Sequence, residues 1–93
     1  MSVYIDDGSR RYGRMRMCHM FADSHAELMQ IAEEIGLRSS WIQYPGTYRE
    51  HFDVCLSKRS AAITAGARVI TARQAGELIL TRRNGVAEKS TEE

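Results

Sequence analysis

The histidines and their neighbouring acids are the residues of this sequence best suited to proton transfer or metal binding. His51 and Asp53 lie two residues apart, so in an extended chain they share one face, where the carboxylate could orient the imidazole. His19 lies between Met17 and Phe21, a setting equally typical of a core histidine whose hydrogen bonds are satisfied. We take His19, His51 and Asp53 as candidate catalytic residues that orient a ligand or move protons.

Two aspartates at the ends of expected strands could bind a metal ion together with these histidines. Asp6 closes an expected strand near the N-terminus, and Asp23 closes the next one. Ligands of open α/β sheets bind outside the carboxyl ends of strands, so these carboxylates could lie at the site. Histidine and aspartate can bind Mg²⁺, Mn²⁺ or Zn²⁺, although no spacing here matches a metal motif such as H-E-x-x-H. The residue types alone are therefore compatible with a divalent metal ion, and a site without a cofactor is the alternative.

The start of an expected helix carries two cations where acidic residues are usual. Ser57 can cap this helix, and Lys58 and Arg59 follow in its first turn. Cations there oppose the helix dipole, whereas the free N–H groups at the same end bind anions. We therefore interpret Ser57, Lys58 and Arg59 as contacts for a phosphate or carboxylate. The alternative is that both cations point into water or pair with Asp53.

A glycine-bearing loop rich in arginine could fold over a nucleotide. The segment RRYGRMR offers Tyr12 for stacking on a base and Arg14 for contact with phosphate. A solvated basic loop is the alternative. Gln43 could read a base through its amide, while the neighbouring Trp41 could stack on it, although we expect Trp41 in the core.

Hydrophobic periodicity and capping signals divide the chain into alternating strands and helices. Alternating or β-branched runs predict strands at residues 2–7, 15–22, 40–44 and 67–71. Capping residues followed by apolar residues at helical spacing predict helices at residues 24–36, 57–65 and 71–83. Residues 45–55 are expected to form a loop. The fold class is therefore α/β, with a sheet of about four strands and three helices in the order β-β-α-β-α-β-α.

Composition describes one folded domain and excludes several classes of protein. The chain has 93 residues, of which 43% are hydrophobic, and a formal net charge of +1. We expect a single domain over residues 1–85 and a disordered C-terminal tail over residues 86–93. The near-neutral charge disfavours nucleic-acid binding, and a chain this short can gain stability as a homodimer. With no long apolar run and no secretory leader, we expect no membrane contact and a cytoplasmic location.

Several segments resemble, in order and spacing, a family of small bacterial and phage proteins, domain of unknown function 4031. The resemblance covers residues 2–73 and is carried by VYIDD, YGRMRMCHMFADSHAELMQIAEEIGL, WIQ and HFDVCLSKRSAAITAGA. It implies a compact intracellular α/β domain in the bacterial host cytosol, and it supplies no catalytic residues. Arg11 departs from the family pattern, where relatives often carry a proline or an apolar residue.

These features favour a small protein that binds a phosphate-bearing ligand, with a nucleotide or cyclic nucleotide signal as the leading candidate. The protein could sequester this ligand or hydrolyse a phosphoester with the help of a metal ion. The alternative is a homodimeric protein–protein interaction module whose adaptable surface is formed by Met15, Met17 and Met20. Nucleic-acid binding is the third candidate, and it predicts an affinity that falls steeply with salt.

Overall fold

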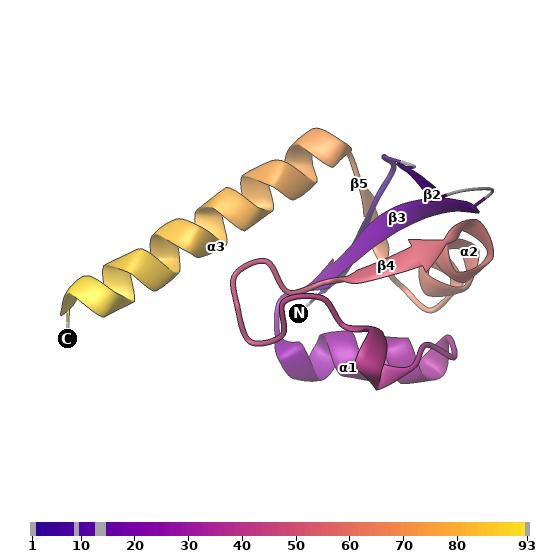
Figure 1. Cartoon of the computed structure of the whole chain (residues 1–93), viewed down its shortest axis with the longest axis horizontal. Coiled ribbons are helices and arrows are strands. Elements are labelled where there is room, and N and C mark those ends of the chain that lie inside the picture. Colours follow the sequence, from indigo (N-terminus) through magenta and orange to yellow (C-terminus); the bar gives the residue numbers. More distant parts are fainter. Residues whose placement is uncertain (1, 9, 13–14, 93) are drawn as a thin grey trace.

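The computed structural model describes residues 2–8, 10–12 and 15–92, which form five strands, three α-helices and a 3₁₀ helix. In chain order they are β1 (Val3–Asp6), β2 (Arg10–Tyr12), β3 (Met15–Ala22), α1 (His25–Glu34), the 3₁₀ helix η1 (Ser39–Trp41), β4 (Phe52–Cys55), α2 (Leu56–Thr64), β5 (Arg68–Ile70) and α3 (Ala72–Glu92). Figure 1 shows one sheet with helices around it. The expected small α/β fold is therefore confirmed, and β2 is an addition to the expected order.

The sheet is mixed and is built around β3, its longest strand. β1 pairs with the second half of β3 and β2 with the first half, both antiparallel. Met17 pairs with both Arg10 and Cys55, so β4 runs antiparallel along the opposite edge of β3. β5 pairs parallel with β1. The path across the sheet is therefore β4, β3, β1 and β5, which leaves β3 flanked on both sides.

The strand that follows α1 lies later in the chain than the sequence predicts. The prediction of a strand over residues 40–44 is wrong, because η1 occupies its first part and only Gln43 forms a β-bridge, with His51. The strand at this place in the order is β4, inside the segment predicted as a loop. Pairing with β3 stabilises these four residues as a strand, and the local sequence does not contain this partner. Trp41 is also not in the core, since it is 51% exposed.

Two helix boundaries also differ from the sequence prediction. α2 begins at Leu56 with Cys55 as its N-cap residue, because β4 runs directly into the helix, and Ser57 therefore lies within the first turn. α3 does not end near residue 83 but continues to Glu92 and extends past the other elements (Figure 1). Alanine, glutamate and lysine in the last turns favour helix. The division into a domain of residues 1–85 and a disordered tail stays a prediction.

Two helices begin at the capping residues that the sequence predicts. At α1, Ser24 Oγ accepts a hydrogen bond from the Glu27 N–H (3.2 Å) and donates to the Glu27 carboxylate (3.0 Å). At α3, Thr71 Oγ1 accepts from the Gln74 N–H (3.0 Å), and the Gln74 side chain accepts from the Thr71 N–H (2.9 Å). Gly36 follows α1 with a φ of 80°, a conformation that favours glycine. These local signals are confirmed.

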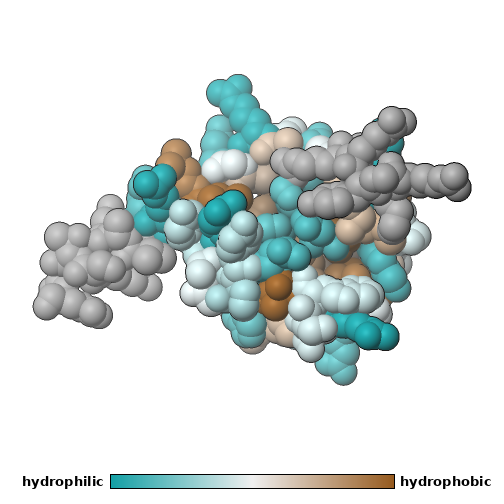
Figure 2. Space-filling model, viewed as in Figure 1, coloured by the Kyte–Doolittle hydropathy of each residue, from teal (hydrophilic) through white to brown (hydrophobic). Residues whose placement is uncertain are grey.

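The surface mixes apolar and polar side chains. On the face shown in Figure 2, apolar residues form separate patches among hydrophilic ones. The large apolar side chains that are exposed come from several elements: Trp41, Tyr44, Leu56, Ile63, Val69 and Leu80. Scattered exposure of this kind is normal for a protein surface. Over the described ranges, no helix combines the length and the apolar character that crossing a bilayer requires.

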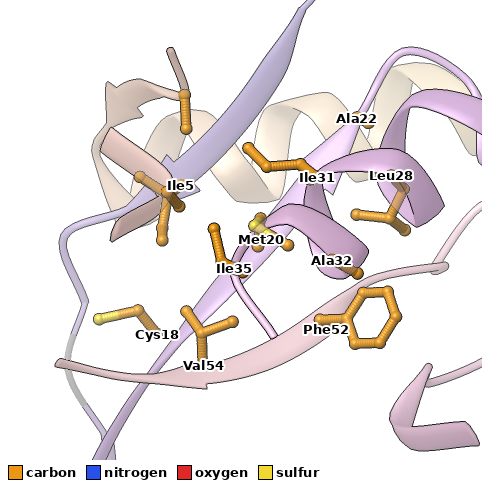
Figure 3. Packing of buried hydrophobic residues seen from close by; sticks show 12 residues of the cluster. Ile5, Cys18, Met20, Ala22, Leu28, Ile31, Ala32, Ile35, Phe52 and Val54 are labelled. Carbon is orange, nitrogen blue, oxygen red and sulfur yellow. The ribbon is translucent and has the colours of Figure 1, made fainter. Parts of the chain in front are cut away.

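One face of the sheet packs against α1 and α2 and forms the hydrophobic core (Figure 3). The cluster of buried side chains consists of Ile5, Cys18, Met20, Ala22, Leu28, Ile31, Ala32, Ile35, Phe52, Val54, Ala62 and Ala67. Burying a side chain the size of Phe52 contributes about 1.5–3 kcal/mol, and a one-residue slip would turn it to the other face. The core therefore fixes the strand register, and alternation places His19 and Asp53 on the opposite face.

Candidate metal centre

The face of the sheet opposite the core carries four of the candidate residues. His19 lies directly opposite Asp53 in the pairing of β3 with β4, and opposed residues on neighbouring strands point to the same face. His51 precedes β4 by one residue and shares the face of Asp53, two positions later. Asp6 ends β1 and contacts His19 from the other side. We name Asp6, His19, His51 and Asp53 the His–Asp cluster.

Contacts within the His–Asp cluster form a continuous series of alternating carboxylates and imidazoles. His19 Nδ1 lies 3.4 Å from Asp6 Oδ2, and His19 Nε2 lies 3.4 Å from Asp53 Oδ1. The same Asp53 oxygen lies 3.3 Å from His51 Nε2. The other nitrogen of this ring, His51 Nδ1, lies 2.6 Å from the backbone oxygen of Arg49. Both imidazoles are therefore contacted at both ring nitrogens.

The arrangement of donors and acceptors in this series leaves room for a positive charge beside Asp53. A carbonyl oxygen only accepts, so His51 Nδ1 carries a proton, and Nε2 of the neutral ring presents a lone pair to Asp53. His19 has a carboxylate beside each nitrogen, while a neutral imidazole has only one N–H to donate. A cation between both Nε2 atoms and the Asp53 oxygen would contact all three atoms.

The geometry of His19, His51 and Asp53 is compatible with a bound metal ion. One ligand atom from each of these residues lies within 4.8 Å of the others. In a tetrahedral zinc site, bonds of about 2.0–2.1 Å separate the ligand atoms by roughly 3.4 Å, close to the 3.3 and 3.4 Å measured to Asp53. Two imidazoles and one carboxylate suit Zn²⁺ or Fe²⁺ better than Mg²⁺, which prefers oxygen ligands. Three ligands also leave a position open for water or substrate.

Asp6 is better placed to orient His19 than to bind the metal ion. Its carboxylate is buried and lies on the Nδ1 side of His19, whereas Asp53 lies on the Nε2 side. A carboxylate in this position fixes the tautomer and direction of a metal-binding histidine. Asp6 Oδ1 also accepts a hydrogen bond from the His19 backbone N–H at 3.0 Å. Backbone and ring of His19 are thus held by the same aspartate.

A cavity of about 630 Å³ opens beside the His–Asp cluster, between η1 and β4. Small-molecule sites have volumes of roughly 300–1,000 Å³. Its apolar wall is formed by Met17, Leu37 and Trp41, and its polar wall includes Gln43, Asp53 and Lys58. Asp53 belongs to both the His–Asp cluster and the cavity, so a ligand in the cavity can reach an ion bound at Asp53.

The two cations predicted to contact an anion both have partners within the protein. Lys58 Nζ donates to the backbone oxygen of Ile35 at 2.6 Å, at the C-terminal end of α1, where the helix dipole favours a cation. Arg59 Nε donates to the backbone oxygen of Asp6 at 3.2 Å. These bonds leave further N–H donors on both side chains, and Lys58 also lies in the cavity wall. Contact with a ligand stays a prediction for both residues.

Ser57, the third predicted anion contact, interacts with Cys55. The Ser57 hydroxyl lies 3.3 Å from Cys55 Sγ. This contact, together with backbone N–H groups at the start of α2, lowers the pKa of the Cys55 thiol below its usual 9.0. Cys55 lies in the wall of the same cavity. The role of Ser57 toward a ligand stays a prediction.

The remaining predicted site residues do not join the His–Asp cluster. Gln43 bridges to His51 and lines the cavity. Asp23 accepts a hydrogen bond from the Ser2 N–H at 2.8 Å and lies about 13 Å along the strand direction from His19, at roughly 3.3 Å per residue. It is therefore too distant to share a metal ion with His19. The Tyr12 side chain and all of Arg14 lie outside the part that the structure describes.

The sequence gives no sign of a second contact between a histidine and a carboxylate. His25 Nδ1 lies 2.5 Å from Glu50 Oε1, which also accepts the Gly46 N–H at 3.1 Å. We name His25 and Glu50 the loop clip, because they tie the loop before His51 to the start of α1. No local spacing links positions 25 and 50, so only the fold reveals this pair.

Fold and geometry define a small mixed α/β domain with a candidate metal centre on the face of the sheet opposite the core. The family described as "Protein of unknown function (DUF4031)" matches the chain over residues 3–84. The protein therefore belongs to the DUF4031 family. No curated protein and no solved structure shows a significant match to it.

Proposed function

We propose that the protein binds a divalent transition-metal ion through His19, His51 and Asp53 and uses it to hydrolyse a phosphoester in a nucleotide-like ligand. The observation that carries this proposal is the shared Asp53 oxygen, which lies 3.4 Å from His19 Nε2 and 3.3 Å from His51 Nε2. A cation at this point satisfies all three atoms without adding a second proton to either ring.

A divalent ion in this position would supply the chemistry that phosphoester hydrolysis needs. It polarises a phosphoryl oxygen and lowers the pKa of a water bound beside it. In the reaction, the water oxygen forms a bond to phosphorus, the ester P–O bond breaks, and one proton of the water ends on the leaving oxygen. Lys58, in the wall of the cavity that Asp53 also lines, supports a phosphate-bearing ligand over a neutral one.

Metal binding is tested by calorimetric titration of chelator-stripped protein with Zn²⁺, Mn²⁺, Mg²⁺ and, without oxygen, Fe²⁺. We expect one equivalent of a transition-metal ion to bind and Mg²⁺ to bind far more weakly. Asp53→Asn should weaken binding by roughly 100-fold or more, because the shared ligand is lost. Glu50→Gln, in the loop clip, is the matched control and should leave the affinity unchanged. Equal affinities for native protein and Asp53→Asn would contradict the site.

Hydrolysis is tested with p-nitrophenyl phosphate, bis(p-nitrophenyl) phosphate and cyclic mononucleotides in the presence of the ion that binds. Turnover that disappears with EDTA and in Asp53→Asn supports the hydrolase. Tight nucleotide binding without turnover would replace hydrolysis by sequestration. If metal binds but neither turnover nor nucleotide binding is seen, the phosphate-bearing ligand is the wrong class.

A further inference from the structure

We propose that the cavity between η1 and β4 binds a single nucleoside monophosphate, as substrate or product, with its base against Trp41 and its phosphate toward Lys58 and Asp53. The proposal deepens the function above by naming the class of ligand. Only its phosphate end rests on the proposed metal ion, because the base end depends on Trp41 and Gln43.

The apolar half of the cavity offers a stacking surface for a base. Trp41 lines this half with Met17 and Leu37, and 51% of its surface stays exposed. The Arg38 guanidinium lies 5.8 Å from the centroid of the ring, and the Trp41 backbone N–H donates to the Arg38 oxygen at 3.0 Å, which fixes the backbone at this position. An exposed indole in a cavity wall, on a backbone fixed by the 3₁₀ helix, is a platform that any nucleobase can stack on.

The polar half of the cavity has the charge that a phosphate group requires. Lys58 is fixed there by its 2.6 Å hydrogen bond to the Ile35 oxygen, which uses one of the three N–H donors of the ammonium group. Asp53 contributes one negative charge, so a bound divalent ion together with Lys58 leaves this end positive. Gln43, in the same wall, adds an amide that can donate to or accept from a base edge.

The size of the cavity and the charge of the chain favour one nucleotide over a polynucleotide. A volume of about 630 Å³ is typical of sites for single small molecules. Nucleic-acid binding would depend on a basic surface that neutralises many phosphates, whereas the chain has a net charge of +1. An apolar wall and a cationic wall within one small cavity match a ligand that is aromatic at one end and anionic at the other.

The single tryptophan of the chain allows a direct test, since all tryptophan emission comes from Trp41. Adenosine monophosphate, adenosine and ribose 5-phosphate are titrated into the full-length protein with Zn²⁺ or Mn²⁺ and again in EDTA. We expect adenosine monophosphate to change the emission and to bind about 10-fold or more tighter than ribose 5-phosphate, which lacks the base. Equal affinities for these two ligands would overturn the proposal.

Variants separate stacking from folding. By calorimetry, Trp41→Leu should lower the affinity for adenosine monophosphate by about 10-fold to 100-fold and leave ribose 5-phosphate and metal affinities unchanged. Trp41→Phe keeps an aromatic face and should retain most of the affinity. Leu80→Ala, at an exposed apolar position on α3, is the matched control without effect. Unaltered nucleotide affinity in Trp41→Leu would refute the assigned platform.

Failure of the metal centre and failure of the nucleotide site give different results. Trp41-dependent nucleotide binding in EDTA, with no metal binding at all, would uphold the cavity and overturn the metal-dependent function. Metal binding without nucleotide binding would overturn the cavity and leave the metal centre in place. Tighter binding of an RNA oligonucleotide, with a steep dependence on salt, would overturn the single-nucleotide ligand.

Discussion

The loop clip and the His–Asp cluster both pair histidine with carboxylate, and they differ in what surrounds the shared oxygen. In the loop clip, Glu50 Oε1 contacts His25 and accepts a backbone hydrogen bond from Gly46. In the His–Asp cluster, Asp53 Oδ1 contacts Nε2 of two imidazoles, and the proton of His51 Nδ1 is already used by a backbone carbonyl. The first oxygen accepts a backbone hydrogen bond and contacts one imidazole, whereas the second lies between two imidazoles.

This difference separates a contact that holds the fold from one that can perform chemistry. The loop clip joins a loop to α1, and a neutral imidazole with a backbone N–H is enough to stabilise its carboxylate. The His–Asp cluster adjoins a cavity, and in our proposal a cation completes it. Both regions combine imidazole with carboxylate, so the balance of donors and acceptors is what distinguishes the candidate site.

Replacing one histidine in each region should give the largest contrast. His19→Gln removes a metal ligand and should weaken binding of Zn²⁺ by roughly 100-fold or more, because two ligands remain. His25→Gln leaves all three ligands in place and should change the affinity less than about 2-fold. Competition with a chromophoric chelator measures both variants, and comparable losses would remove the distinction between the regions.

Asp6 should have the next largest effect on metal affinity, although it is not a ligand. Asp6→Asn keeps an oxygen that can accept the His19 backbone N–H but weakens the contact with His19 Nδ1, so affinity should fall by about 10-fold to 100-fold. Asp7→Asn is the neighbouring control, since Asp7 accepts a hydrogen bond from the Ala72 N–H at the start of α3. A metal affinity of Asp6→Asn equal to that of the native protein would show that Asp6 does not position His19.

Without metal, a substitution in the loop clip should lower the free energy of unfolding more than a substitution in the His–Asp cluster. At pH 8 in EDTA, Glu50→Gln should lower the free energy of unfolding by about 0.5–1 kcal/mol, because the contact with His25 is weakened. Asp53→Asn should leave the free energy of unfolding unchanged or raise it. The amide N–H of asparagine can donate to the lone pair on His51 Nε2, whereas the carboxylate of Asp53 has no proton to donate. Urea denaturation monitored by circular dichroism measures both. A larger loss for Asp53→Asn would indicate that the His–Asp cluster holds the fold.

The smallest expected effect is on the reactivity of Cys55, which contacts Ser57, two residues later in the chain. The Ser57 hydroxyl and the N–H groups at the start of α2 lower the pKa of Cys55. The thiolate therefore stabilises the folded state at a pH above the pKa of Cys55 in the unfolded chain. This stabilisation is lost as the pH falls through the lower pKa of Cys55 in the folded protein. In metal-free protein at pH 7.5, iodoacetamide should modify Cys55 before the buried Cys18. Ser57→Ala should slow this reaction by a few-fold. Mass spectrometry of the two peptides at several pH values reports the rates, and an unchanged pH profile in Ser57→Ala would refute the stated cause.

Much of the fold follows from signals within a few residues of the chain. The capping pairs at Ser24 and Thr71 and the turn at Gly36 predict helix starts and ends that the structure contains. β4 escaped prediction because its four residues become a strand only through pairing with β3. The exposure of Trp41 also depends on distant packing, since burial is a property of neighbours that the local pattern does not contain.

The sequence by itself determined the local features. His51 and Asp53 share a face wherever the backbone is extended, which indicates the candidate chemistry. A capping box needs only neighbouring residues, which indicates where a helix begins. Tertiary structure alone decided which of these groups meet. The register of β3 against β4 sets His19 opposite Asp53, and the packing of α2 against α1 gives Lys58 a carbonyl of Ile35 as partner. Hydrogen bonds along a helix join residues that are close in the sequence. Contacts across a sheet join residues far apart in the sequence, and burial of the core selects the pairing register of the strands.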